Sequence, residues 1–312
     1  MKQTMEINVI RSILILLVIL IHLTPFKDCY PDAQSAILAF VVPLFLFITG
    51  YLFNVNKTWK QYATYLRSML LMYISLETAY IILSYFFPIK DGISELNVSV
   101  VLNKLVLNPI GPYWYLHTMI ICGSIYYVAH QVCRYFNKDY AISSAVLVAV
   151  ILSYYSPLLG LMSPLAYFAG VICKKHSNEC ILHGSFVAIP IAIVTLFYGI
   201  VCKPEYATQL SYFSIVLGTC IIESVIWCAQ RLPMKANKIL NFIGANTLPI
   251  YLFHPMFTLP SKLLFSKMIA NDNILCFSIL TITIATIGSL MIGRALDLTG
   301  VSMLLFKKKM IR

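Results

Sequence analysis

Apolar stretches long enough to cross a lipid bilayer recur along the whole chain, and they leave few folds open to it. A helix needs roughly 17–25 mainly apolar residues to span the hydrocarbon core. Of the 312 residues, 60% are hydrophobic and 11% are charged, whereas a soluble domain carries about 25% charged residues. A surface with so few charges must face lipid. Ten stretches approach or reach the required length: 9–27, 36–54, 65–87, 113–133, 140–157, 158–173, 183–202, 210–228, 245–264 and 274–293.

We therefore predict an all-α, polytopic membrane protein, a bundle of about ten transmembrane helices. It is expected to form one transmembrane domain over residues 1–312, without a soluble domain. The stretch 158–173 is the weakest of the ten, because it is short and contains Pro164. Joining it to its neighbour would give nine helices and would invert the second half of the chain.

The distribution of basic residues decides between nine helices and ten. With ten helices, most of the 23 Lys and Arg residues fall in cytoplasmic segments. With nine helices, Arg231, Lys235 and the basic tail at 307–309 would lie outside. The positive-inside rule therefore favours ten helices with the N- and C-termini both in the cytoplasm.

The net charge and the cysteines bear on two other classes of function. The formal net charge is +11 at pH 7, but topology and anionic lipid head groups explain basic residues at cytoplasmic helix ends. We therefore predict the lipid bilayer as a partner, and no nucleic acid. The nine cysteines lie mostly within apolar stretches and include no CxxC pair. They are typical of small buried residues, and they predict neither a metal site nor a disulfide framework.

Arg11 and His22 lie in the first apolar stretch, where ionisable side chains are costly and often functional. Eleven positions correspond to three helical turns plus about 20°, so the two side chains share one face about 16 Å apart along the axis. An arginine at the cytoplasmic mouth suits a phosphate-bearing ligand, and a deep histidine suits a general base. The spacing is comparable to an extended pantetheine arm. The alternative is a topological arginine and a histidine that is hydrogen-bonded in a helix interface.

Three further charged residues lie in predicted spans or at their ends. Arg67 opens the third span, either as a second phosphate contact or as an interfacial anchor, which its position alone favours. Glu77 and Glu223 lie inside the third and eighth spans, where each needs a partner or a proton. Either carboxylate could orient a histidine, pair with an arginine or line a substrate path.

Two spans contain small or aromatic residues with a predicted contact. In the second span, Gly50 permits a close approach between helices and Thr49 can hydrogen-bond across the interface. In the fourth span, Trp114 follows Gly-Pro-Tyr and precedes His117. This pattern favours an aromatic belt at the membrane interface. The alternative is a platform that stacks on a sugar beside a hydrogen-bonding histidine.

The ninth span has a broken pattern. Residues 239–244 predict a short helix that Gly244 ends as a glycine cap, after which Asn246 or Thr247 caps the next helix. Broken helices at membrane depth are tolerated where they line a cavity. We therefore expect His254, which lies at such a break, to line a cavity. The interruptions are three prolines: Pro249, Pro255 and Pro260.

Taken together, these segments resemble the acyltransferase-3 family of bacterial membrane-bound O-acyltransferases. Four motifs carry the resemblance: Arg11-x10-His22, Pro43-Leu-Phe-Leu-Phe-Ile-Thr-Gly-Tyr51, Trp114-Tyr115-Leu116 and Gly244-Ala-Asn-Thr-Leu-Pro-Ile-Tyr-Leu-Phe-His254-Pro255. The second is like the family's PxFFxxSGY pattern, and the third opens the fourth span. The last runs through the ninth span and is like the family's GxxSLxIYLxHP pattern.

The resemblance implies a stand-alone O-acetyltransferase of the O-antigen or exopolysaccharide kind, multi-pass in a bacterial inner membrane. Such proteins move an acyl group, usually acetyl, from cytoplasmic acyl-CoA to a hydroxyl of an extracytoplasmic or lipid-linked glycan. By the same resemblance, His22 is the catalytic histidine, as a general base or an acyl relay, and Arg11 and Arg67 bind acetyl-CoA. The residues expected to contact the other substrate are Trp114, His117, Glu77, Glu223 and His254.

The chain departs from the family pattern in two positions. Thr49 replaces the usual serine before Gly50, which is a mild change. Many members carry an RxxR pair at the start of the third helix, whereas Arg67 is followed by Ser-Met-Leu, so one arginine matches. We also expect the chain to act without the C-terminal SGNH-type hydrolase domain that some members use.

Two other functions stay open. The stronger is a transporter or exporter of a small solute or polysaccharide, since membrane domains of similar pattern are linked to both. Broken helices and buried glutamates suit transport as well. The weaker is a degenerate structural member of a glycan assembly complex, which the presence of both Arg11 and His22 disfavours.

Overall fold

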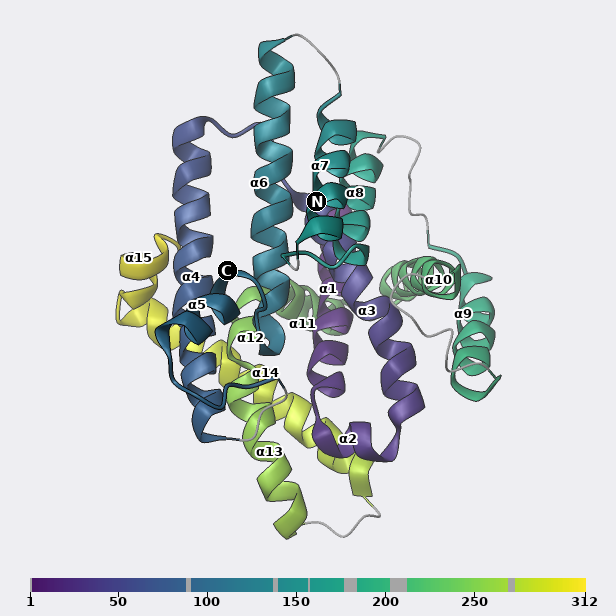
Figure 1. Cartoon of the computed structure of the whole chain (residues 1–312). Helices are drawn as coiled ribbons and strands as arrows, with labels where there is room; N and C mark the ends of the chain where they lie inside the picture. Colours follow the sequence, from purple (N-terminus) through teal and green to yellow (C-terminus); the bar gives the residue numbers. More distant parts are fainter. Residues whose placement is uncertain are drawn as a thin grey trace. The chain divides into compact units, whose positions relative to one another are not determined.

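The computed structural model describes residues 2–87, 91–136, 140–156, 158–176, 184–202, 212–268 and 273–312. Within these ranges the chain forms helices and no strand, and each of the ten predicted stretches overlaps at least one helix (Figure 1). The all-α class is therefore confirmed. The number of membrane crossings and the side on which each terminus lies stay predictions.

The chain divides into two compact units. The first comprises Met1–Phe45, Cys180–Gly300 and Lys309–Arg312, and the second comprises Leu46–Glu179 and Val301–Lys308. The helix that holds the second predicted span contributes to both units. The expectation of a single transmembrane domain over 1–312 stays a prediction.

The first unit is built around its N-terminal helix, α1, which packs against α10, α11, α12 and α14 (Figure 1). Two predicted spans are each broken into two helices in this unit, the first between α1 and α2 and the ninth between α12 and α13. Its elements are α1 (Lys2–Ile21), α2 (Thr24–Cys29), the first part of α3 (Pro31–Leu52), α9 (Ala188–Phe197) with the π-helical turn Tyr198–Cys202, α10 (Tyr212–Ala229), α11 (Met234–Ala245), α12 (Thr247–Phe253), α13 (Pro255–Met268) and α14 (Ile274–Leu298).

In the second unit, α6 packs against α4, α7 and α8 (Figure 1). The weak stretch forms a helix of its own, α8, separate from α7. Pro164 lies in the first turn of α8, where a helix needs no N–H donor. The elements are the last part of α3, α4 (Trp59–Phe86), α5 (Val98–Val106), the 3-10 turn Gly111–Tyr113, α6 (Trp114–Tyr135), α7 (Ala141–Tyr155), α8 (Met162–Lys175) and α15 (Val301–Phe306).

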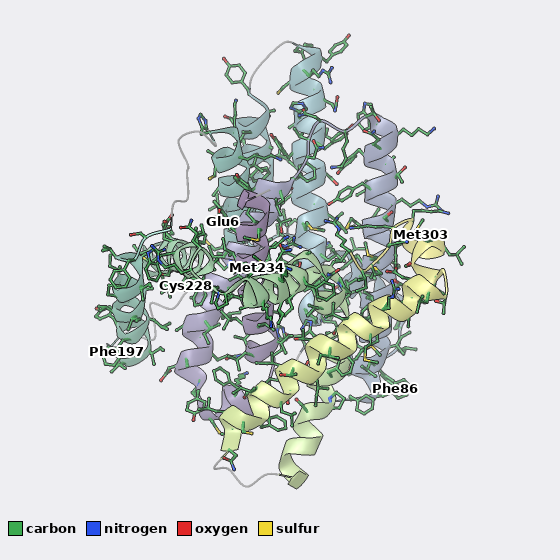
Figure 2. All side chains as sticks on the ribbon, turned by 180° about the vertical axis from the view of Figure 1, so that it is seen from behind. Glu6, Phe86, Phe197, Cys228, Met234 and Met303 are labelled. Atoms are coloured by element: carbon green, nitrogen blue, oxygen red, sulfur yellow. The ribbon has the colours of Figure 1, made fainter. Side chains whose placement is uncertain are left out.

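Several helices have the length and the surface of membrane spans. Among the described residues, α3, α4 and α14 are long and apolar enough to cross a bilayer. Helices α7 and α9 and the part Ser214–Ala229 of α10 are apolar but shorter. Large apolar side chains point outward from them, including Phe86 and Phe197 (Figure 2), which are 70% and 62% exposed. Exposed apolar surface on this scale indicates that lipid surrounds these helices.

Gly244 corrects the predicted helix cap. It lies inside α11, which continues to Ala245, and it is not among the glycines with positive φ. A Cβ atom on Gly244 would lie 1.7 Å from the carbonyl oxygen of Asn8 in α1. The glycine therefore allows two helix backbones to touch. The prediction was wrong because a sequence pattern does not distinguish a glycine that frees φ from one that removes a side chain.

Asn246 occupies the N-cap position of α12, but its side chain makes no cap hydrogen bond. The amide instead donates to the carbonyl oxygen of Phe242 (2.8 Å) and accepts from the backbone N–H of Arg312 (2.7 Å). The prediction of a side-chain cap by Asn246 was therefore wrong, because its side chain is bonded to Phe242 and Arg312 instead. Pro255 alone of the three prolines separates two helices, since Pro249 lies within α12 and Pro260 within α13.

The close approach expected at Gly50 is confirmed in the second unit. A Cβ atom on Gly50 would lie 1.9 Å from the carbonyl oxygen of Tyr167 in α8. A Cβ atom on Gly170 would lie equally close, at 1.9 Å, to the carbonyl oxygen of Phe47. Thr49 also makes the expected hydrogen bond across an interface, with the hydroxyl of Tyr115 in α6.

Substitution of Gly244 tests the contact between α1 and α11. In Gly244→Ala the new methyl group meets a backbone oxygen that no side-chain rotation can move, so the helices must separate. Overpacking of this kind costs on the order of 1–3 kcal/mol. We expect a lower thermal unfolding midpoint in detergent. Gly160→Ala is the control, because a Cβ atom there meets nothing within 4 Å, and equal midpoints for both variants would contradict the close contact.

Candidate functional site

Arg11 is held at the interface between α1 and its neighbours in the first unit. Its guanidinium donates to the hydroxyl of Thr247 at the start of α12 and, at 3.4 Å, to the side-chain oxygen of Asn8. The amide of Asn8 in turn donates to the side chain of Asn241 in α11 (3.0 Å). Arg11 is half-buried, so it is fixed in direction while part of it stays accessible.

His22 lies at the end of α1, and its ring completes the hydrogen bonding of the last turn. The backbone N–H of His22 donates to the carbonyl oxygen of Ile19 (3.1 Å) instead of that of Val18. The Val18 carbonyl is therefore left without its helical donor. The Nδ1 atom of His22 lies 2.6 Å from that oxygen. The side chain of Gln34 donates to the next free carbonyl, that of Ile21 (2.9 Å). His22 itself remains exposed.

This contact defines the tautomer of His22. A carbonyl oxygen can only accept, so Nδ1 carries the hydrogen. In the neutral ring, Nε2 then presents a lone pair, and no hydrogen-bond partner for it occurs in the described part of the chain. An exposed imidazole with Nδ1–H anchored and Nε2 free has the form that a general base requires.

His254 repeats the same arrangement at the end of α12. Pro255 has no N–H, so the carbonyl of Tyr251 lacks its helical donor. The Nδ1 atom of His254 lies 2.8 Å from that oxygen and 3.2 Å from the carbonyl oxygen of Ile250. The residue is fully buried, and its Nε2 has no hydrogen-bond partner among the described residues. The expectation that His254 lines a cavity stays a prediction.

Two contacts pair α1 with α12. Arg11 meets Thr247 near one end. Near the other end, the rings of His22 and His254 meet edge to face, with their centroids 5.3 Å apart and an interplanar angle of 67°. The first and last of the sequence motifs, far apart along the chain, therefore form one site. His22 is exposed, and His254, whose ring it contacts, is buried.

Glu77 lies in the second unit, where it holds a loop. Its Oε1 accepts from the backbone N–H of Ile110 (2.7 Å), and the residue is fully buried. The next residue, Gly111, has a φ of 63°, and a Cβ atom on it would lie 2.3 Å from the ring of Tyr80. Glu77 therefore fixes the chain reversal that leads into α6. Its Oε2 has no hydrogen-bond partner among the described residues.

His117 and Trp114 lie in α6, which begins immediately after this loop. The ring of His117 is buried and its Nε2 donates to the carbonyl oxygen of Val106 in α5 (3.0 Å). The ring also contacts Tyr73, with centroids 5.4 Å apart. Trp114 is half-buried. These contacts make His117 a link between α5 and α6.

Arg67 and Glu223 have surroundings of a different kind. Arg67 lies on an exposed face of α4, together with Leu71 and Ile74, which are 37% and 42% exposed. This position suits the interfacial anchor. The carboxylate of Glu223 in α10, in the first unit, accepts from the backbone N–H of Gly184 (2.8 Å), so it holds the turn that precedes α9.

Three residues around Arg11 were not predicted from the sequence. These are Asn8 and Thr247, which bond to Arg11, and Asn241, which bonds to Asn8. Asn8 lies one turn before Arg11 on α1, and that spacing was the available signal. Asn241 and Thr247 are more than two hundred positions away, and no local pattern pairs them with α1. No group of three or more His, Cys, Asp or Glu side chains that could hold a metal ion occurs among the described residues.

The role of Glu77 as a loop clamp predicts different outcomes for two substitutions. Glu77→Gln keeps an acceptor for the Ile110 N–H and should leave the thermal unfolding midpoint close to that of the wild type. Glu77→Leu leaves a buried N–H unpaired, which costs about 1–3 kcal/mol. Glu95→Leu is the control at an exposed carboxylate. If Glu77→Leu unfolds at the same temperature as this control, Glu77 does not hold the loop.

One comparison with known proteins covers both the first and the last of these motifs. A model of the acyltransferase-3 family, described as an acyltransferase domain, matches residues 6–293, nearly the whole chain. No curated protein and no solved structure matches the chain. With a match over this length and the apolar helices described above, the chain is a membrane acyltransferase that belongs to the acyltransferase-3 family.

Proposed function

We propose that this protein is a multi-pass O-acetyltransferase of the bacterial inner membrane. It takes the acetyl group from cytoplasmic acetyl-CoA and transfers it to a hydroxyl of an extracytoplasmic or lipid-linked glycan, such as an O-antigen or exopolysaccharide. The observation that carries the proposal is the pairing of α1 with α12. Arg11, whose guanidinium suits phosphate oxygens, and His22, a histidine with a free Nε2, lie along one helix about 16 Å apart.

The tautomer of His22 supports a role as general base. The Nε2 lone pair accepts the proton of the glycan hydroxyl while the hydroxyl oxygen attacks the thioester carbonyl carbon. The C–S bond breaks as the new C–O ester bond is completed. The proton on Nε2 then passes to the sulfur of CoA, so that His22 returns to its starting state. The anchor at Val18 (2.6 Å) holds the ring in one orientation throughout.

Arg11 supports the binding of acetyl-CoA at the other end of the site. The guanidinium matches phosphate oxygens, and its bonds to Thr247 and Asn8 fix it before the ligand arrives. An extended pantetheine arm reaches from there to His22. Arg67 is the second proposed contact with acetyl-CoA, although its exposed face of α4 suits a membrane anchor equally well. On the glycan side, Trp114 and His117 at the start of α6 are the proposed contacts.

The transporter alternative draws less support from the glutamates than the sequence suggested. Glu77 accepts from the N–H of Ile110 and Glu223 from that of Gly184. Each carboxylate thus has a role in holding a loop, which requires no solute path. Uptake or export of a solute in liposomes without CoA would favour the transporter.

Removal of the proposed base tests the reaction. In His22→Ala, acetyl transfer should fall by about 10²–10⁴-fold, the usual contribution of a general base, while the protein stays folded, with a thermal unfolding midpoint lowered only by the loss of the bond to Val18. Two measurements check this: release of free CoA thiol by the purified protein, and the mass of glycans from cells that carry each variant. Wild-type cells should show the mass of one added acetyl group per modified unit.

Glycans of unchanged mass with and without the wild-type protein, in cells that make the acceptor, would contradict acetyl transfer. A His22→Ala variant with full activity would contradict the role of His22 alone.

His254 is proposed as a positioning residue behind His22. In His254→Phe the ring contact remains, but the Nδ1–H bond to Tyr251 is lost and the ring can shift. Misplacement by about 1 Å can cost up to about 10²-fold in rate. We expect kcat to fall while KM for acetyl-CoA stays constant, because Arg11 is untouched. His254→Asn, whose amide can still donate to Tyr251, should lose less. A higher KM with unchanged kcat would instead assign His254 to substrate binding.

A further inference from the structure

Two lysines meet at the end of α3 in the second unit, outside every predicted span. The Nζ atom of Lys57 donates to the carbonyl oxygen of Asn54 (2.8 Å), and that of Lys174 donates to the carbonyl oxygen of Phe53 (2.7 Å). The two acceptors are consecutive in the chain, so the two ammonium groups are neighbours. Lys57 comes from the loop between α3 and α4, and Lys174 comes from the last turn of α8.

Lys57 is half-buried, whereas Lys174 is exposed as a residue although its bond to Phe53 is partly buried. The Nζ of Lys57 lies over the rings of Phe53 and Tyr65, 5.2 Å and 5.0 Å from their centroids. Burial lowers the pKa of Lys57, and the charge of Lys174 lowers it further. Burial also lowers the pKa of Lys174. Two like charges are thus held together at a cost, and neither forms an ion pair with a residue in the described ranges.

Helix capping accounts for part of this arrangement. The C-terminal end of a helix carries about half a negative charge, and lysines there bind its last carbonyl groups. The half negative charge at the helix end is much smaller than the two positive charges of Lys57 and Lys174, so most of their charge stays uncompensated. Each ammonium group also has three N–H donors, and one carbonyl bond occupies one of them. The pair therefore offers both charge and donors to a further anion.

We propose that Lys57 and Lys174 form a binding site for a phosphate group, separate from Arg11. Lysine binds phosphate as a compact point charge, and a phosphate between the two ammonium groups would remove their repulsion. In the predicted topology both lysines face the cytoplasm. The phosphate can belong to CoA or to the head group of an anionic phospholipid. The CoA source rests on the proposed acetyltransferase function, whereas the lipid source does not.

The lowered pKa values give the site a pH dependence. Only protonated lysines attract the anion, so affinity is complete below their pKa values. It falls as the pH rises through them, below the range near 10.4 at which an ordinary lysine loses its charge. Bound phosphate favours the charged forms, so binding at alkaline pH should take up protons.

The experiment compares two double variants of the full-length protein in lipid nanodiscs. The test variant is Lys57→Gln with Lys174→Gln. The control is Lys60→Gln with Lys235→Gln, which removes the same charge from exposed positions. Lys57→Arg with Lys174→Arg keeps both charges and should restore binding. Thermal unfolding in the nanodiscs shows that each variant is folded. One readout is CoA titration in phosphatidylcholine nanodiscs, and the other is native mass spectrometry of phosphatidylglycerol retained from mixed nanodiscs.

Each outcome has a distinct meaning. If the test variant weakens CoA binding by about tenfold or more and the control does not, the site holds a phosphate of CoA. Loss of retained phosphatidylglycerol with unchanged CoA affinity assigns the site to lipid. If neither ligand is affected, the proposal is overturned. If the wild-type protein binds no CoA in any nanodisc, the proposed acetyltransferase function is contradicted. The amount of retained phosphatidylglycerol then still shows whether Lys57 and Lys174 bind a lipid phosphate.

Discussion

The backbone contact between α1 and α11 is the constraint on which the rest of the first unit depends. Gly244 has no side chain, so α11 can lie against the carbonyl of Asn8. Since α12 begins two residues after α11 ends, this contact also sets the position of α12 along α1. The hydroxyl of Thr247 then reaches Arg11, and His254 reaches His22. The contact between Gly244 and the backbone of Asn8 involves no polar side chain, yet it brings the residues of the polar site together.

Breaks in two helices supply the two histidines of that site. Each break leaves a backbone carbonyl without its donor, which is costly away from water. His22 and His254 both meet this need with Nδ1, and the same bond leaves Nε2 as the basic nitrogen. One hydrogen bond thus both completes the helix end and leaves Nε2 free. The two residues differ in exposure, and for this reason the mechanism we propose places the reaction at His22 and the support at His254.

The parts of the molecule that follow from local pattern could be predicted from sequence. Apolar stretches indicated the all-α membrane class, helical spacing placed Arg11 and His22 on one face, and Gly50 marked a close approach. The remainder depends on partners that are remote in sequence. Asn8 and Asn241 are 233 positions apart, and nothing near either one indicates the pairing. Local patterns likewise do not show that Glu77 holds a loop, because its acceptor role depends on a backbone N–H in another segment.

A structure of the full-length protein with a non-transferable acetyl-CoA analogue would test the central claim most directly, namely that acetyl transfer takes place where α1 and α12 meet. We expect the acyl carbonyl carbon of the analogue beside Nε2 of His22, the pantetheine arm along α1 and a phosphate at Arg11. Nδ1 of His22 should still bind the carbonyl of Val18. An analogue bound with its acyl group away from His22, or a His22 ring turned so that Nε2 binds Val18, would contradict the claim.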